Sequence, residues 1–476
     1  MRSCGILDVS ENLKVIAIYP ILLIDIGSTY TKVTAVDLDA PVVLGTGAAH
    51  TTIQTDVTAG LAEALTILAQ QTGVHSFRER FACSSAAGGL AMVASGLVPA
   101  LTEKAARMAC LGAGAKVIRS FSYGLTEEDM AEIDSLNPDI FLLAGGVDGG
   151  NEKNILHNAE MLNTAKTDFP IVLAGNRNAA ARCEALLRER TVYRTENVMP
   201  RLDALNLEPI QAQIRALFLE HIIHAKGLGQ VAEELNRPII PTPAAMLEAM
   251  ELLSCGTGNI PGIGELVAVD LGGATTDVYS VATGAPAGAN TVVKGLPEPF
   301  AKRTVEGDIG MRYSIHGILE AVGIETVAAM SGLDAETVQR QTDRLFQTPD
   351  TLPDTPAFAA LDRALASAAV ATAVMRHAGT IEEVYTPLGQ TFLQTGKDLT
   401  QVRSLIVTGG AIIHSPDAGE IARYALFDDH SPTSLRPREA EIYVDQPYIL
   451  ASMGLLAKAY PREALVLMKQ ALGVKS

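Results

Sequence analysis

The sequence contains little cysteine, and its cysteines lack the spacings that metal and redox sites use. Only five of the 476 residues are cysteine, and no Cys-x-x-Cys pair occurs. This pattern excludes a disulfide framework and gives no zinc or iron–sulfur motif, so we expect reduced, mostly buried thiols. They are Cys4, Cys83, Cys110, Cys183 and Cys255.

Clustered positive charge is also missing. The chain has 37 Lys and Arg residues against 54 Asp and Glu, a net charge of −17, and no Lys/Arg run. Nucleic-acid binders need a positive stripe along the phosphate backbone, so this composition argues against that class. We expect an acidic cytoplasmic protein.

Long apolar runs are absent as well. The apolar segment at residues 15–24 ends at Asp25 and is interpreted as a strand, and no other stretch approaches the ~20 residues of a membrane helix without a charge, Gly or Pro. We therefore expect no membrane association. With 48% hydrophobic and 19% charged residues, the length predicts a globular chain of two to four folding units.

Three glycine-bearing turns follow short apolar runs at widely separated positions. They are residues 22–29 (LLIDIGST), 267–277 (VAVDLGGATTD) and 405–411 (LIVTGGA). The first two share one pattern, in which a buried strand ends in Asp and a turn of Gly, Ser or Thr follows. The third has no acid after its strand. Together they predict a split nucleotide site, with two phosphate turns and a third turn forming a wall for adenosine.

The residue types in these turns suit phosphate and a divalent cation. Glycine allows the main chain to approach closely, so that backbone N–H groups can point at phosphate, and hydroxyls add donors. The two aspartates are expected to face each other across the site, hold hydrated Mg²⁺ and orient the attacking water. The predicted binding residues are Gly27, Ser28, Thr29, Gly272, Gly273, Thr275, Thr276, Gly409 and Gly410, with Asp25 and Asp270 as catalytic and metal-binding residues.

Two further charged residues are assigned to this site, each with an alternative. Lys32 follows the first turn and could lean its ammonium toward the β- and γ-phosphates, or be a solvated strand lysine. Asp277 ends the second motif and could assist Thr275 or the metal, or cap the turn.

Strand and helix patterns alternate along the chain and predict an α/β fold with an inserted α/β unit. We expect a first lobe over residues 1–95, an inserted α/β subdomain over 96–232, a second lobe over 233–415, and C-terminal helices over 416–476 that close back on the first lobe.

Two other motifs are interpreted as structural. The glycine-rich segment 143–151 (LAGGVDGGN) lacks the spacing of a dinucleotide loop. The acidic turn Glu306-Gly307-Asp308 could supply a base or metal contact, but a structural or partner role is favoured.

The three turns, in this order and with Lys32 after Asp25, resemble the phosphate-1, phosphate-2 and adenosine motifs of the superfamily that joins actin, the heat-shock chaperone ATPases and the sugar kinases. That resemblance implies an actin-like (ribonuclease H-like) two-lobed ATPase fold that uses ATP/ADP and Mg²⁺.

A closer resemblance covers nearly the whole chain from Ile21 onward. It is carried by residues 25–32 (DIGSTYTK), 83–90 (CSSAAGGL), 143–151 and 306–312 (EGDIGMR), and it is to the MutL or GlmL family of glutamate mutase accessory proteins. The family implies a weak ATPase that serves adenosylcobalamin-dependent glutamate (methylaspartate) mutase as a chaperone-like reactivating or assembly factor. The client is then a protein.

Two other functions stay open on the same fold. In a small-molecule kinase, a carboxylate would deprotonate a substrate hydroxyl in the interlobe cleft. An actin-like filament former is disfavoured, because the large insertion would obstruct longitudinal stacking.

Overall fold

Two mixed β-sheets with the same strand arrangement form the centre of the molecule. The computed structural model describes residues 20–27, 29–51, 57–85, 90–202, 204–223, 228–387 and 389–474. The first sheet has the order β10-β4-β1-β2-β3 and the second the order β16-β14-β13-β19-β20. Their strands are β1 (Ile21–Ile26), β2 (Tyr30–Asp37), β3 (Val42–His50), β4 (Glu79–Ser84), β10 (Ile240–Pro241), β13 (Leu266–Leu271), β14 (Thr276–Val281), β16 (Ala301–Glu306), β19 (Ser404–Thr408) and β20 (Glu441–Val444).

Each sheet consists of a three-stranded antiparallel meander followed by two parallel strands. In the first, β1, β2 and β3 pair antiparallel while β4 lies parallel to β1 and β10 parallel to β4. In the second, β13, β14 and β16 pair antiparallel while β19 lies parallel to β13 and β20 parallel to β19. The strands β1 and β14 are buried along their whole length, because both lie inside their sheets between paired neighbours. The chain thus builds one topology twice, once in each lobe.

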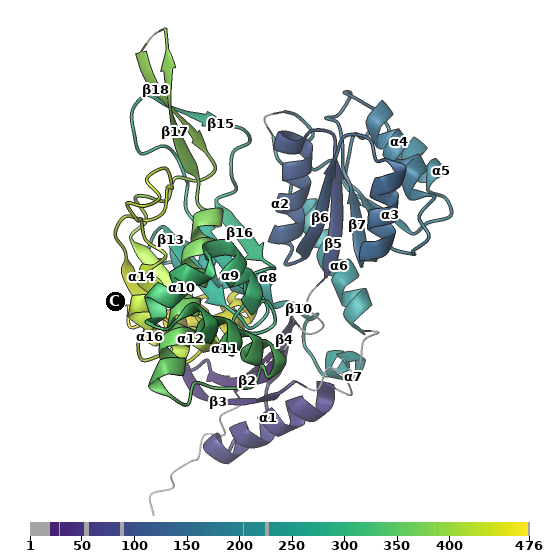
Figure 1. The fold of residues 1–476 in the computed structure, drawn as a ribbon. Coiled ribbons are helices and arrows are strands. Elements are labelled where there is room, and N and C mark those ends of the chain that lie inside the picture. The colour runs from purple at the N-terminus through teal and green to yellow at the C-terminus, as the bar shows by residue number, and fades with distance from the viewer. Residues whose placement is uncertain are drawn as a thin grey trace, which may run out of the picture.

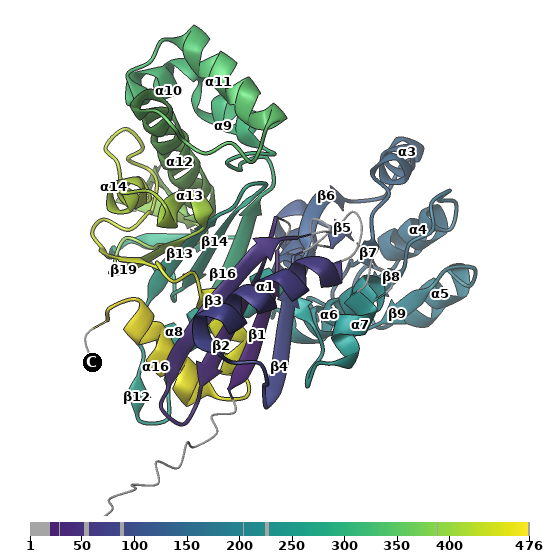
Figure 2. The same cartoon turned by 90° about the horizontal axis from the view of Figure 1, so that it is seen from below.

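Helices between the two sheets join the lobes into one body. Helix α8 (Thr242–Cys255) follows β10 as α15 (Leu450–Ala457) follows β20, and α16 (Pro461–Ala471) packs beside them (Figure 2). Apolar residues of both sheets and all three helices form one core. Helices α8 and α15 touch at Gly454, where a Cβ would lie 1.8 Å from the Ala245 oxygen. Only glycine permits that approach.

A third sheet lies to one side of the two lobes (Figure 1). It is wholly parallel, in the order β6-β5-β7-β8-β9. We call it, with its helices, the parallel-sheet region. Its elements are β5 (Ala91–Gly96), a π-helical turn (Pro99–Glu103), α2 (Lys104–Gly112), β6 (Lys116–Ser122), α3 (Glu127–Leu136), β7 (Ile140–Leu143), α4 (Lys153–Leu162), β8 (Ile171–Leu173), α5 (Ala180–Leu186), β9 (Val192–Arg194) and α6 (Glu208–Ile223). The short helix α7 (Leu228–Glu233) leads back toward β10.

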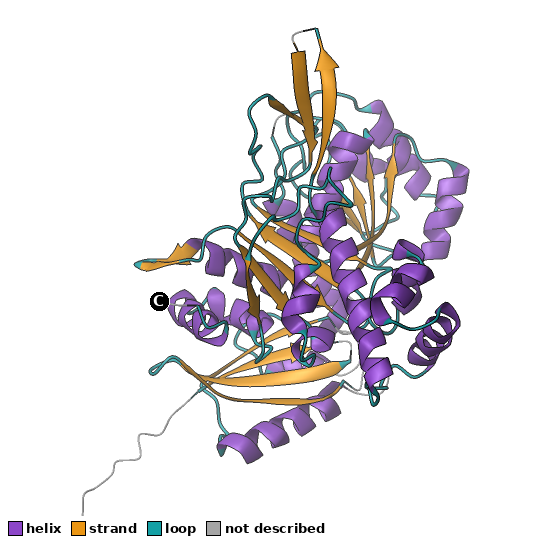
Figure 3. Cartoon of the chain, turned by 60° about the vertical axis from the view of Figure 1, so that its left-hand side comes forward, coloured by secondary structure: helices purple, strands orange, loops and turns teal. Residues whose placement is uncertain are grey.

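A smaller three-stranded sheet projects from the second lobe (Figure 3). It consists of β15 (Thr291–Lys294), β17 (Thr380–Thr386) and β18 (Gly389–Thr395), in the order β15-β18-β17.

Helices cover the outer face of each lobe. Helix α1 (Val57–Thr72) packs on β2 and β3. The second lobe carries α9 (Ile315–Val322), α10 (Ile324–Ser331), α11 (Ala335–Gln347), α12 (Pro356–His377), α13 (Gly410–Ile413) and α14 (Ala418–Arg423), and β11 (Gly256–Thr257) pairs with β12 (Ile260–Pro261). Helix α12 is long and apolar enough to cross a membrane, but 67% of its most apolar window is buried inside the protein, as in a core helix.

Candidate functional site

The first two glycine turns are equivalent hairpin tips, one in each lobe. The N–H of Gly27 donates to the Tyr30 oxygen at 3.0 Å, and the N–H of Gly272 donates to the Thr275 oxygen at 2.9 Å. A Cβ on Gly27 would lie 2.6 Å from that Tyr30 oxygen, so the turn requires glycine. Both turns are thus closed by the same hydrogen bond, from the glycine N–H to the oxygen three residues later.

The same register places charged residues at equivalent positions below each tip. Asp25 faces Lys32 across β1 and β2, and Asp270 faces Asp277 across β13 and β14. The Lys32 Nζ lies 3.8 Å from Asp25 Oδ2. Thr29 lies in the first turn, where its carbonyl accepts from Thr51 N–H at 2.8 Å. Ser28 lies outside the described residues.

Asp25 is held by groups from two other elements. Thr242, at the first residue of α8, donates its hydroxyl to Asp25 Oδ1 at 2.8 Å, and the Cys83 thiol lies 3.4 Å from the same oxygen. Burial raises the pKa of Cys83 well above its usual range, and the charge of Asp25 adds to the effect. The thiol therefore stays protonated, as expected for a packed turn and not for a nucleophile. Residues 86–89 of that turn lie outside the described residues.

The second turn is braced by the segment after β16. The carbonyl of Gly273 accepts from the N–H groups of Arg312 and Tyr313 at 2.8 and 2.9 Å, and a Cβ on Gly310 would lie 2.4 Å from the Ala274 carbonyl carbon. Nearby, Thr276 donates its hydroxyl to the Ile309 oxygen at 3.0 Å.

The acidic turn that precedes this brace pairs with a helix of the same lobe. Glu306 and Asp308 both contact Arg376 of α12, at 2.7 and 3.0 Å. These ion pairs fix the acidic turn to α12, and a structural or partner role for it stays a prediction.

Asp277 is buried and paired. Its Oδ1 accepts from Nε and Nη2 of Arg303, each at 2.7 Å, and its Oδ2 lies 3.3 Å from the Thr275 hydroxyl. Both carboxylate oxygens thus have protein partners.

The third turn lies beside the second. Strand β19 pairs with β13, and a Cβ on Gly409, whose φ is +103°, would lie 2.3 Å from the Leu271 oxygen. A Cβ on Gly410 would have nothing within 4 Å, so space is open beside this residue. Thr408, the last residue of β19 and the one before Gly409, donates its hydroxyl to Asp445 Oδ2 at 3.1 Å.

Asp445 is a third strand-end aspartate. It follows β20 directly, is fully buried, and accepts from the N–H groups of Ile449 and Leu450 at the start of α15. Burial raises its pKa to about 6, although those hydrogen bonds oppose the effect. The sequence EIYVD at 441–445 is another strand pattern that ends in Asp, although no glycine turn follows it, and this feature could have revealed Asp445.

Residues of both lobes meet in one group, which we call the site cluster: Asp25, Lys32, Asp270, Asp445 and Tyr448. The Lys32 Nζ lies 3.2 Å from the centre of the Tyr448 ring. Burial lowers the Lys32 pKa, but Tyr448, Asp25 and Asp270 outweigh it and raise the pKa above its usual value. Lys32 is therefore charged and held between Asp25 and Tyr448, while its contact with phosphate stays a prediction.

Asp270 has the most strongly shifted carboxyl of the site cluster. Burial and the charge of Asp277 raise its pKa to about 7, with Asp25 and Asp445 adding to the effect and Lys32 opposing it. The charge of Asp25 raises the pKa of Asp270, and both carboxylates raise the pKa of Lys32. The structure therefore brings the two predicted carboxylates into one electrostatic environment.

This donor set fits a magnesium ion that keeps much of its water. No group of three or more His, Cys, Asp or Glu side chains arranged around a metal position occurs among the residues the structure describes. Mg²⁺ in nucleotide sites is bound by one or two carboxylates, waters and phosphate oxygens, so a complete protein cage is not needed. Asp25 and Asp270 supply hard oxygen ligands of that kind.

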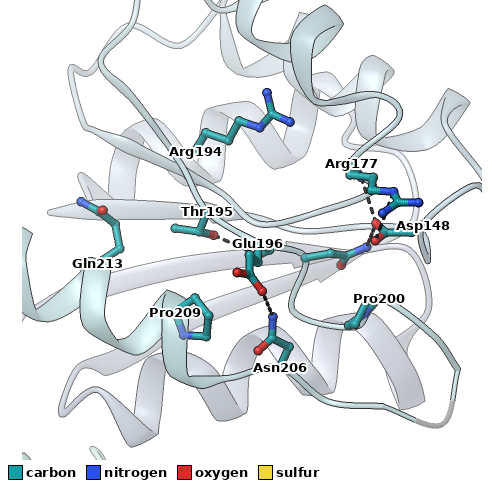
Figure 4. A pocket seen from close by; sticks show the side chains of 10 residues that line it. Asp148, Arg177, Arg194, Thr195, Glu196, Pro200, Asn206, Pro209 and Gln213 are labelled. Carbon is teal, nitrogen blue, oxygen red and sulfur yellow. Dashed lines mark hydrogen bonds and ion pairs between the residues drawn. The ribbon is translucent and has the colours of Figure 1, made fainter.

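A separate hollow of about 710 Å³ lies at the carboxyl ends of β7, β8 and β9 (Figure 4). Its charged side chains have protein partners: Arg177 pairs with Asp148, Arg194 pairs with Glu184, and Glu196 accepts a hydrogen bond from the Asn206 amide. Asn176 braces the loop at 143–151 through the Gly149 N–H. This hydrogen bond agrees with a structural turn, which stays a prediction, and the hollow is not part of the site cluster.

The duplicated topology with a cluster at the two hairpin tips defines the class: an α/β, actin-like (ribonuclease H-like) fold of two lobes with an inserted α/β region. The model of the MutL protein family matches residues 21–472. A curated relative, Protein MutL of Clostridium tetanomorphum, is 44% identical over 453 residues, covering 94% of this chain and 98% of the relative. The chain belongs to the MutL family, as the sequence motifs predicted.

Solved structures of this fold are similar only at low identity. A glycerol dehydratase reactivase has 12% identity and a TM-score of 0.33 over 92% of this chain and 99% of its own. The activator of 2-hydroxyisocaproyl-CoA dehydratase from Clostridium difficile, with bound ADPNP, has 10% identity and a TM-score of 0.31 over 96% and 98%. Because these TM-scores are low, the likeness supports no conclusion about function.

Proposed function

We propose that the chain binds Mg·ATP between its two lobes and hydrolyses it. The observation that supports this most strongly is the pair of equivalent hairpin tips, each closed by a glycine N–H, with Asp25, Lys32 and Asp270 directly beneath them. Backbone turns of this kind suit phosphate, and the lysine offers a point charge for phosphate oxygens. The third turn, at Gly409 and Gly410, is proposed to border the adenosine.

The residues of the two tips would divide the work. Main-chain N–H groups of the two tips other than those of Gly27 and Gly272, which close the turns, would hold the phosphates. Lys32, already fixed against Tyr448, would compensate the phosphate charge. Bound Mg²⁺ would neutralise phosphate charge and favour ionisation of water. Asp270, whose pKa of about 7 lies near the working pH, would orient the attacking water and accept its proton.

The proposed physiological role is that of an accessory protein. MutL-family membership, with the resemblance to glutamate mutase accessory proteins, supports a role in assembling or reactivating adenosylcobalamin-dependent glutamate mutase. Nucleotide turnover would open and close the lobes, and the parallel-sheet region would contact the client enzyme. A cytoplasmic location is proposed with it.

Nucleotide binding can be tested at one glycine. A Cβ on Gly273 would have no atom nearer than 3.9 Å, so Gly273→Val should fold while placing methyl groups over the amide turn. Calorimetric titration with Mg·ADP should show binding to the wild type and loss of binding to this variant. Gly419→Val, in α14 with open space around it, is the matched control and should bind normally. Equal binding by Gly273→Val contradicts the site.

The role is tested by phosphate release. Purified protein is assayed alone, with the cobalamin mutase, and with small hydroxyl acceptors; Asp270→Ala should abolish release in each case. Stimulation by the mutase supports the accessory role. Stimulation by a sugar or hydroxy acid, with a phosphorylated product, would establish a kinase instead.

A further inference from the structure

One buried arginine joins the second hairpin tip to the parallel-sheet region. Arg303 lies on β16, and its side chain is only 3% exposed. On one side its Nε and Nη2 contact Asp277 Oδ1. On the other, Nη1 donates to the Leu111 and Ala115 oxygens, each at 3.0 Å. These oxygens belong to the end of α2 and the loop that follows it.

Because one rigid guanidinium contacts all of these partners, Arg303 cannot move relative to one of them without moving relative to the others. A guanidinium is planar and carries five N–H donors in a fixed fork. Four directions are taken by Asp277, Leu111 and Ala115, and the Tyr279 hydroxyl also interacts with the group. Any shift of Asp277 must therefore rotate or pull the donors that hold the end of α2, and any shift of α2 must act on Asp277.

The same loop also touches the element that holds Asp25. Gly114 has a φ of +94°, and a Cβ on it would lie 2.7 Å from the Cβ of Pro241, directly before α8. The next residue, Thr242, donates to Asp25. The loop at 111–115 is thus fixed between one contact that leads to Asp277 and another that leads to Asp25.

We propose that Arg303 is a positioning residue that couples the second hairpin tip to the parallel-sheet region, by sharing one guanidinium between Asp277 and the carbonyls of Leu111, at the end of α2, and Ala115, in the loop that follows. The inference rests on the proposed nucleotide site. Nucleotide at the tips then changes how firmly α2 is held, and by reciprocity a partner that moves α2 changes nucleotide affinity.

The test is amide hydrogen exchange of residues 104–122, with and without Mg·ADP, on protein whose nucleotide binding is measured by calorimetry in the same buffer. In the wild type, exchange in this segment should differ between the two states. Arg303→Lys keeps a charge for Asp277 but cannot span to both carbonyls. It should bind nucleotide and lose the nucleotide-dependent difference. Arg303→Gln should lose the difference as well, with circular dichroism confirming its fold.

Lys104→Ala is the control for a general loosening of the junction. Lys104 begins α2 and pairs with Glu298 of the second lobe at 2.6 Å, without touching Asp277. This variant should exchange faster in both states but retain the nucleotide-dependent difference. Coupling through Arg303 is wrong if wild-type protein binds nucleotide with no change in this segment, or if Arg303→Lys keeps the change. Absence of nucleotide binding in the wild type overturns the proposed function itself, and this inference with it.

Discussion

The raised pKa of Asp270 predicts how the rate of ATP hydrolysis should depend on pH. Because its pKa is about 7, the carboxyl should be about one-tenth ionised at pH 6 and about nine-tenths ionised at pH 8. If the ionised form orients water, kcat/KM for ATP hydrolysis should rise about tenfold between these values, since kcat/KM reports ionisations of the free enzyme. The sign follows from the raised pKa: activity is low below pH 7 and gained above it.

Lys32→Gln supplies the comparison that assigns the effect. Lys32 lowers the pKa of Asp270, so removing its charge should move the midpoint of the kcat/KM profile above pH 7. Phosphate groups themselves titrate near pH 6, and that contribution is common to both proteins. The shift between the two profiles therefore carries the assignment. Identical midpoints, or a wild-type profile that is flat from pH 6 to 8, would refute the reasoning.

Three substitutions test the packing that positions the turns, each by urea unfolding. Gly409→Ala should lower the free energy of unfolding by about 3 kcal/mol, because its Cβ would meet the Leu271 oxygen at 2.3 Å in a positive-φ turn. Gly389→Ala, also at positive φ but in open space, is the control and should lower it clearly less. Equal losses of stability would argue against the close approach at Gly409. Asp445→Ala should cost about 1–2 kcal/mol by removing the acceptor for the first N–H groups of α15; an unchanged midpoint contradicts that role. Gly454→Ala should cost about 1–3 kcal/mol, since its Cβ would lie 1.8 Å from a backbone oxygen of α8, and full stability would show that the helices are further apart.

The turns could be predicted from sequence because their signal is local. A strand that ends in Asp and runs into Gly within two residues identifies Asp25 and Asp270 without knowledge of the fold. A search for any strand pattern that ends in Asp, without requiring a following glycine, would also have identified Asp445 at the end of residues 441–445. Long helices such as α1 and α8 could also be predicted from the sequence, because their apolar residues recur at helical spacing.

The partners of these residues could not be predicted, because they come from distant parts of the chain. Thr242 is 217 positions from Asp25, and Arg303 is 192 positions from Leu111. A lone Thr or Arg carries no mark of such a contact in the sequence. Asp277 is an example. The sequence pattern allowed two roles for it, an active-site role and a turn cap, and its buried ion pair with Arg303 is seen only in the folded structure.

The shared nucleotide site is tested most directly by a crystal structure with Mg²⁺ and a non-hydrolysable ATP analogue. We expect one nucleotide whose phosphates lie between residues 27–29 and residues 272–276, with Lys32 at a phosphate oxygen and the metal near Asp25 and Asp270. A nucleotide bound elsewhere, or phosphates that contact only one of the two hairpin tips, would contradict a site shared by the two lobes.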